Sequence, residues 1–279
     1  MKKWKKVIEP KTGLLDLHLE EIWQYRSLIY MLAKRNYEVQ YKQTILGMLW
    51  MFITPILSSG VFTFVFGNVG GFSTDGMPQF FFYLSGNILW TLFSSCVNYN
   101  VNIFLNNAYI FGKVYFPRLT VPLANSIYNV IKFSFSLLIL LVVWGYFLFT
   151  GEISWPGVKI LLLLLSVLLV TVLGTAIGLI ISSVTTKYRD FAVLVSFGLQ
   201  LLMYASPVVY PMSQLPEKAK ALIGVNPIAP MLEMFRYAFT GSGSISPSGI
   251  IYSISITFIL LFVGLIMYNQ TEKTFIDVV

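Results

Sequence analysis

Apolar residues gather in long runs that are separated by short polar segments. A helical bilayer span needs about 18 or more predominantly apolar residues in a row. Runs of that kind lie at residues 45–67, 79–104, 119–149, 157–182, 191–210 and 248–269. Because soluble cores do not need such lengths, the pattern predicts an all-α integral membrane protein with six transmembrane helices and both termini on one side of the membrane.

The segment before the first run is amphipathic rather than uniformly apolar. From Leu14 to Tyr41, apolar and aromatic residues recur at helical spacing, with charged residues between them. This pattern predicts a helix, or a broken helix, that lies in the lipid headgroup layer. A plain basic anchor explains the same periodicity. Gly47 and Pro55 follow at the turn into the first span, where we expect a bend or a close helix contact.

Residues 207–243, before the last run, combine several prolines with an apolar stretch at 231–239 that is too short to span. This composition predicts a pair of short re-entrant helices on the outer side. Glu233 and Arg236 are three residues apart and can meet on one helical face. They serve either as a clip between the short helices or as an outer gate.

Composition and charge agree with a membrane protein. Hydrophobic residues make up 56% of the chain and charged residues 11%, against about 25% charged in soluble domains, and the mean hydropathy is +0.74. Lys and Arg concentrate in residues 1–44 and in the second and fourth connections, which places those segments in the cytoplasm. We expect one domain over residues 1–279: a cytoplasmic or interfacial part (1–44), a six-span bundle (45–269) and a cytoplasmic tail (270–279).

Several kinds of chemistry are disfavoured. The single cysteine, Cys96, lies in a predicted span, and the single histidine, His18, has no partner at ligand spacing, so we expect no metal site. No phosphate-binding glycine loop is present, and every Asp and Glu falls outside the predicted spans. The net charge of +7 reflects the cytoplasmic bias of Lys and Arg rather than nucleic-acid binding. These absences favour a transport subunit without a catalytic residue, driven by a separate ATPase.

The second cytoplasmic connection, residues 106–118, is too apolar for a solvated loop of its length. Its aromatic side chains either pack back on the protein's own helices or anchor in a cleft of a soluble subunit. Pro117 suits the first turn of the third span, where its missing N–H costs little. We therefore expect a short helix, a break and then a long membrane helix.

Several short motifs together resemble one family, the permease subunits of type 2 ATP-binding-cassette (ABC-2) exporters of lipid-linked cell-surface polysaccharides. The resemblance covers nearly the whole chain and is strongest to permeases for wall teichoic acid and O-antigen. Its motifs are Tyr25-Arg26, Tyr41-Lys42-Gln43-Thr44-Ile45-Leu46-Gly47-Met48-Leu49-Trp50 leading to Pro55, Lys113-Val114-Tyr115-Phe116-Pro117-Arg118, and Asn226-Pro227 followed by Arg236.

The resemblance implies a half-transporter in the bacterial cell membrane. Two copies of this chain would form the pore, and two copies of a nucleotide-binding subunit, which carries the ATP and Mg, would dock below it. The chain itself would hold no cofactor. The coupling residues implied are Asn107, Tyr109, Phe111, Lys113, Val114, Tyr115, Phe116, Pro117, Lys187, Tyr188, Arg189 and Asp190.

Cationic and aromatic residues supply candidates for substrate contacts. A polyprenyl-pyrophosphate-linked polymer presents an anionic head at the inner headgroup level, where Arg26, Lys34, Arg35 and Lys42 either form a cytoplasmic gate or anchor the chain to anionic lipids. Trp50 and Trp90 are candidates for lining the path. Lys132, inside the third run, either reaches the inner interface or faces the pore.

Two other function classes remain open at this point. An ABC-2 permease that exports a drug or a small lipid would share the same architecture. A membrane transferase that acts on prenyl lipids would show turnover without any partner.

Overall fold

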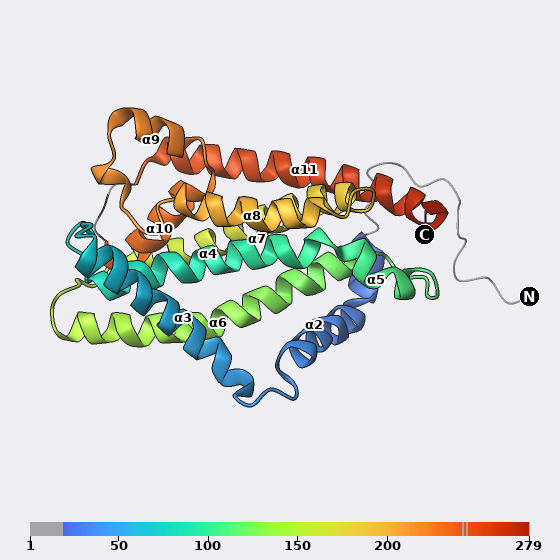
Figure 1. Cartoon of the computed structure of the whole chain (residues 1–279), viewed down its shortest axis with the longest axis horizontal. Helices are drawn as coiled ribbons and strands as arrows, with labels where there is room; N and C mark the ends of the chain where they lie inside the picture. The colour runs from blue at the N-terminus through green and yellow to red at the C-terminus, as the bar shows by residue number, and fades with distance from the viewer. Residues whose placement is uncertain (1–18, 242, 244, 279) are drawn as a thin grey trace, which may run out of the picture.

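The computed structural model describes residues 19–241, 243 and 245–278, and their backbone forms eleven α-helices with short 3₁₀ and π segments. The long helices run side by side along the longest axis of the molecule (Figure 1). Helix α5 (Ile103–Phe111) and the C-terminal end of α11 (Pro247–Val278) lie at one end of this bundle, and α9 (Glu217–Gly224) and α10 (Ile228–Thr240) lie at the other. We call these the α5 end and the α10 end. His18 and the rest of residues 1–18 lie outside the described residues.

Five helical stretches are long and apolar enough to cross a membrane, which confirms five of the six predicted spans by length and composition. They are Gly47–Val69, which contains α3 (Trp50–Phe62) and a π-helical turn (Thr63–Val69); α4 (Gln79–Val101); α6 (Thr120–Phe149); Gly157–Thr185, which contains α7 (Leu161–Thr185); and Pro247–Lys273 in α11.

The span expected at 191–210 is shorter than predicted. Its helix, α8, covers Phe191–Tyr204, or 14 residues, which is about 21 Å at 1.5 Å per residue. A bilayer core is about 30 Å thick. Turns follow from Ala205, so Pro207 and Pro211 end the helix before it reaches spanning length.

The amphipathic segment forms two helices, α1 (Leu19–Gln24) and α2 (Arg26–Tyr41), which meet at Tyr25. The prediction of a broken helix is confirmed. The turn into α3 contains two residues with positive φ, Gln43 at 68° and Gly47 at 49°. A Cβ at Gly47 would meet nothing within 4 Å, so of the two alternatives, a bend or a close helix contact, this glycine fits the bend.

Close helix contacts occur instead on α7, which lies against both α4 and α11. A Cβ added to Gly174 would come within 2.7 Å of the Cys96 Cβ, and one added to Gly178 within 2.6 Å of the Asn100 Cβ. These two glycines are four residues apart on one face of α7, the arrangement by which membrane helices approach closely. A Cβ added to Gly264 of α11 would come within 2.9 Å of the Ala176 carbonyl oxygen on α7, so this glycine also allows a close helix contact.

The connection at 106–118 has the predicted order of short helix, break and long helix. The break runs from Gly112, and α6 begins at Thr120. Pro117 therefore precedes the helix instead of occupying its first turn, and Pro122 lies within the first turn. Two short helices, α9 and α10, likewise stand before the last span, as the prolines predicted.

Candidate functional site

A lateral cavity of about 410 Å³ opens between α2, α3, α4 and α6. Three of its residues, Trp50, Thr54 and Ser58, follow one another at intervals of four along one face of α3. Lys132 and Ser136, also four apart, come from α6. The remaining lining residues are Gln40, Tyr41, Thr44, Met51, Pro55, Ile88 and Thr91. The wall thus combines hydroxyl groups, an indole and one ammonium group with apolar surface.

The side of this cavity that α2 provides is held by side-chain amides. Asn36 Nδ2 on α2 donates to Asn125 Oδ1 on α6 at 2.8 Å. Asn125 in turn donates to the Asn100 Oδ1 of α4 at 3.0 Å. One turn further along α2, Gln40 Oε1 accepts hydrogen bonds from Tyr99, at 2.5 Å, and from Tyr128. Because the two α2 residues are four apart, they lie on one face, and that polar face points into the bundle.

The four predicted gate cations have different environments. Arg35 Nη2 donates to Asn107 Oδ1 at 3.1 Å, which joins α2 to α5. Lys34 and Lys42 are each 3.9 Å from a carboxylate oxygen of Glu38 on the exposed side of α2. Arg26 is exposed and donates to a backbone carbonyl one turn earlier. The four therefore do not converge on one point, and none of them lines the cavity.

Of the three predicted pore residues, two meet at the cavity. Trp50 is 44% exposed, and it shares the lining with Lys132. Trp90 is buried in the core, with its ring centroid 5.3 Å from that of Phe93. Lys132 lies about three turns inside α6 and lines the cavity.

The predicted coupling residues at 107–117 divide into two groups. Tyr109, Val114 and Tyr115 are exposed large side chains, and Lys113 Nζ lies 3.7 Å above the Tyr109 ring. Asn107, Phe111 and Phe116 are buried within the chain, where Phe111 and Phe116 pack against each other at 5.8 Å. Part of this segment thus packs back on the protein's own helices, and the rest of it is exposed; anchoring in a soluble subunit stays a prediction.

The other predicted coupling residues, 187–190, form an exposed turn between α7 and α8. Thr185 Oγ1 at the end of α7 donates to the Val101 carbonyl at the end of α4, at 2.5 Å. Since α5 begins two residues after Val101, this turn lies at the same end of the bundle as residues 107–117, which we call the coupling segment.

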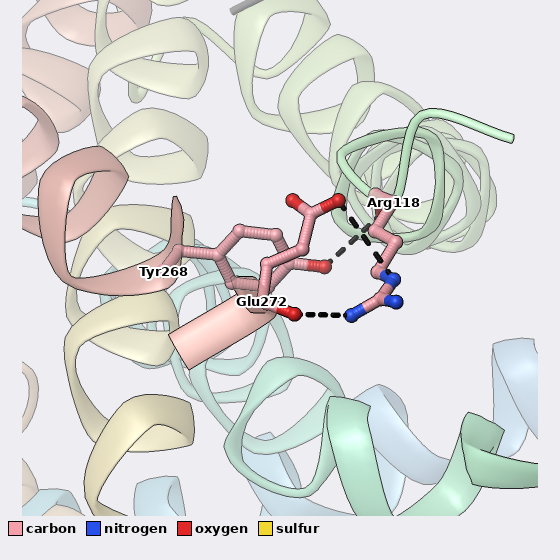
Figure 2. Close-up of polar contacts among 3 residues, drawn as sticks. All are labelled: Arg118, Tyr268 and Glu272. Atoms are coloured by element: carbon pink, nitrogen blue, oxygen red, sulfur yellow. Dashed lines mark hydrogen bonds and ion pairs between the residues drawn. The ribbon is translucent and has the colours of Figure 1, made fainter. Parts of the chain in front are cut away.

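A contact that we did not predict joins residues 112–119 to the last helix. Arg118 Nη1 donates to the Glu272 carbonyl at 2.6 Å, and its Nε lies 3.7 Å from the Glu272 carboxylate. The Tyr268 hydroxyl donates to the Arg118 carbonyl at 3.1 Å. Figure 2 shows both α11 side chains turned toward Arg118. The family-like motif ending at Arg118 was the only signal in the sequence, and it did not indicate a partner.

At the α10 end, Arg236 is 2% exposed. Its guanidinium donates to the carbonyls of Pro207 and Val208 at 2.7 and 2.8 Å and lies 3.7 Å from the centroid of the Phe82 ring. Arg236 therefore holds the turn that follows α8, whose carbonyls lack helical partners.

Glu233 has a different partner from the one that we expected. Its Oε1 accepts a hydrogen bond from the Met212 amide at 3.4 Å. Arg236 lines a small cavity with it, but the ion pairs found among the described residues do not include these two. Burial raises the pKa of Glu233 above its usual range, although the nearby guanidinium acts in the opposite direction.

Within the part of the chain that the structure describes, no group of three or more His, Cys, Asp or Glu side chains has an arrangement that could hold a metal ion. The chemistry available at the two ends and in the cavity is that of hydrogen bonds, charge and aromatic surface.

Comparison with known proteins identifies the family of the chain. The model of the ABC-2 type transporter family matches residues 27–240. The O-antigen export system permease protein RfbA of Klebsiella pneumoniae is 28% identical over 254 residues, which cover 90% of this chain and 95% of the relative. The polysialic acid transport protein KpsM of Escherichia coli is 24% identical over 229 residues, which cover 82% of this chain and 87% of the relative. The capsule polysaccharide export inner-membrane protein CtrC of Neisseria meningitidis is 22% identical over 262 residues, which cover 91% of this chain and 95% of the relative.

The family match spans most of the multi-pass bundle, including the cavity, the coupling segment and Arg236. It confirms the resemblance seen in the motifs. The chain therefore belongs to the ABC-2 type transporter family, as a membrane permease subunit related to permeases of polysaccharide export.

Proposed function

We propose that this chain is the membrane half of an ATP-driven exporter that moves a polyprenyl-pyrophosphate-linked polysaccharide from the cytoplasmic side across the cell membrane. The observation that carries the proposal is the cavity of about 410 Å³ between α2, α3, α4 and α6. On this proposal the α5 end is cytoplasmic, and the cavity receives the head of the lipid-linked substrate.

The composition of the cavity wall suits such a head. The Lys132 ammonium attracts a phosphate group, because a cation in a partly buried site is little screened by solvent. The hydroxyls of Thr54, Ser58 and Ser136 offer hydrogen bonds to sugar hydroxyls. Trp50 presents an aromatic face on which the apolar face of a sugar ring can pack. An apolar cavity without these polar groups would fit a drug or a simple lipid better.

Energy would come from a separate subunit that docks at the α5 end. Two neighbouring exposed apolar side chains there, Val114 (59%) and Tyr115 (61%), offer the kind of anchors found at protein interfaces. The exposed turn at 187–190 adds charged groups at the same end of the bundle. We propose two such ATPase subunits beneath a homodimer of this chain.

The polymer itself is a finer part of the proposal. The overall likeness of the sequence favours a teichoic acid, whereas the relatives compared above are named for O-antigen, polysialic acid and capsule polysaccharide. The cavity would contact the lipid-linked head rather than the repeating units. Offering the purified complex each lipid-linked polymer in turn therefore decides between them.

The test uses proteoliposomes that contain the chain and its ATPase partner, with lipid-linked polymer supplied on the ATPase side. We expect ATP-dependent movement of the polymer, at least about tenfold slower with Lys132→Met, because a charged hydrogen bond to phosphate is lost. Lys159→Met, at the α10 end, is the matched control and should leave the rate unchanged. Equal rates for both variants would refute the role of the cavity.

A second measurement tests the docking surface. Val114→Asp together with Tyr115→Asp should abolish co-purification of the ATPase, since two charges would be buried in the interface. Export of a drug in place of polymer would instead assign the chain to small-molecule transport. Turnover of prenyl lipids by the chain alone would make it a transferase.

A further inference from the structure

The α5 end contains a connection between two elements that are far apart in the chain. Arg118 is the last residue of the motif that begins at Lys113, directly after the coupling segment. Glu272 follows it by 154 positions. The two are joined by a hydrogen bond of 2.6 Å to the Glu272 carbonyl and by a carboxylate contact of 3.7 Å. The Arg118 side chain is only 11% exposed, so solvent screens this pair less than a surface pair.

Tyr268 strengthens the same connection from the other side. It is fully buried, its ring stacks on that of Phe104 in α5 at 4.7 Å, and its hydroxyl donates to the Arg118 carbonyl at 3.1 Å. Together, Tyr268 and Glu272 thus attach α11 to Phe104 of α5 and to Arg118. Figure 2 shows the contacts with Arg118. The three residues Arg118, Tyr268 and Glu272 are called the clamp below.

The position of the clamp along α11 is also informative. Tyr268 and Glu272 lie 21 and 25 residues after the start of α11 at Pro247, which is about 32 and 38 Å along the helix. A bilayer core is about 30 Å thick. With Pro247 placed at one edge of the bilayer core, the clamp would lie at or just beyond the other edge, at the α5 end of the bundle.

A pull on residues 112–117 can reach the bundle along the peptide chain, which leads back through α5 into α4 and forward into α6. A separate route is the clamp, which leads to α11 and, through the close approach at Gly264, to α7. Because packed helices move as rigid elements, the clamp route would displace α11 directly, whereas the peptide chain reaches this helix only after α6 to α10.

We propose that the clamp transmits movement of residues 112–117 to α11 and α7, so that the last span follows the docked ATPase subunit. This inference rests on the proposed function, because it needs an ATPase at the α5 end. In it, Arg118 is a positioning residue: it contacts no substrate and acts through α11.

The main experiment measures polymer moved per ATP hydrolysed in proteoliposomes that contain the whole complex. Tyr268→Phe removes one hydroxyl bond and keeps the ring on Phe104, and we expect transport per ATP to fall about fivefold. Arg118→Gln should lower it more than about tenfold. Binding of the ATPase subunit and its hydrolysis rate should remain at the wild-type level, which a general loss of structure would not allow.

The matched control lies on the same helix. The Tyr252 hydroxyl donates to the Val225 carbonyl at 2.8 Å at the α10 end, so Tyr252→Phe deletes the same kind of bond from α11 without touching the clamp. This variant should move as much polymer per ATP hydrolysed as the wild type. If Tyr268→Phe and Arg118→Gln also keep that ratio while the wild-type complex transports polymer, the clamp is refuted.

A distance measurement separates this inference from the proposed function. Spin labels at positions 113 and 273 of the complex report whether residues 112–117 and the end of α11 move together when ATP binds. We expect one narrow distance distribution with and without ATP in the wild type, and a broad or shifted one with Arg118→Gln. A wild-type complex without transport would refute the proposed function, whereas a distribution that Arg118→Gln leaves unchanged would refute the clamp.

Discussion

Replacement of Arg236 by Met should strongly destabilise the α10 end of the bundle. Methionine is of similar length and can remain beside the Phe82 ring, but it offers no donor to the carbonyls of Pro207 and Val208. Those two oxygens lie 2.7 and 2.8 Å from the guanidinium nitrogens. The turn after α8 would keep its shape only with two buried carbonyls unpaired, or it would have to open.

The magnitude follows from these contacts. Hydrogen bonds that involve a charged group contribute about 1.5–3 kcal/mol each, and two of them give about 3–6 kcal/mol. Removing a buried charge also removes its desolvation cost, which offsets part of that loss. A net loss of about 3–5 kcal/mol in the free energy of unfolding remains. For a chain of this size, about 2–4 °C per kcal/mol corresponds to a melting temperature about 6–20 °C lower.

The assay is thermal unfolding of the detergent-purified protein, with tryptophan fluorescence as the signal. Lys159→Met is the matched control, because Lys159 also donates to a carbonyl, that of Gly241 at 3.1 Å, and also lies over a ring, that of Tyr237 at 4.7 Å. Its contacts are exposed to solvent. We expect that control to shift the melting temperature by no more than about 2 °C.

A second substitution perturbs the same site without removing the charge. A Cβ at Gly86 would come within 2.8 Å of the Val208 carbonyl oxygen and would also collide with the guanidinium. Gly86→Ala should therefore destabilise, whereas Gly145→Ala, where a Cβ meets nothing within 4 Å, should be neutral or stabilising by up to about 1 kcal/mol. Wild-type melting temperatures for both Arg236→Met and Gly86→Ala would show that the reasoning is wrong.

Three further predictions concern other parts of the molecule. Gly178→Val should separate α7 from α4 and lower the melting temperature, unlike Gly198→Val, whose Cβ position is open. Burial raises the pKa of Glu233, so the folded protein holds this proton more tightly than the unfolded chain does; the resulting stability is present below pH 4.5 and is lost as the pH rises through the pKa of the folded state. Glu233→Gln should therefore flatten the fall in melting temperature above pH 4.5. An unchanged pH profile would contradict this. Asn125→Leu leaves the Asn36 amide without its acceptor at 2.8 Å, and limited proteolysis should then cut α2 faster than in Ser255→Ala.

The spans could be predicted because one physical quantity sets them. Apolar runs at 79–104 and 119–149 became helices Gln79–Val101 and Thr120–Phe149, since a bilayer requires a minimum length of apolar helix. The same reasoning overestimated the run at 191–210. Hydropathy counts Val208 and Val209 as part of a span, but both are buried in the core beyond the end of α8.

The candidate site was only partly predictable. Trp50 and Lys132 were identified as pore candidates from residue type, and they do meet at the cavity. The amide contacts of Asn36 and Gln40 were not identified from the sequence. A polar residue on an amphipathic helix is expected to face solvent unless the position of a neighbouring helix is known. Arg35 was grouped with three exposed cations for the same reason, although it donates to Asn107 on α5.

The sequence by itself determined the class of the protein, five of the six expected spans and the family, because apolar length and short motifs are local properties of the chain. The tertiary structure decided which side chains face one another. Arg118 meets Tyr268 and Glu272 across 150 and 154 positions, and Arg236 meets Val208 and Pro207, in the turn after α8, across 28 and 29 positions. Such pairs depend on how helices rotate and cross when they pack, and helical periodicity within one segment carries no information about the rotation of another.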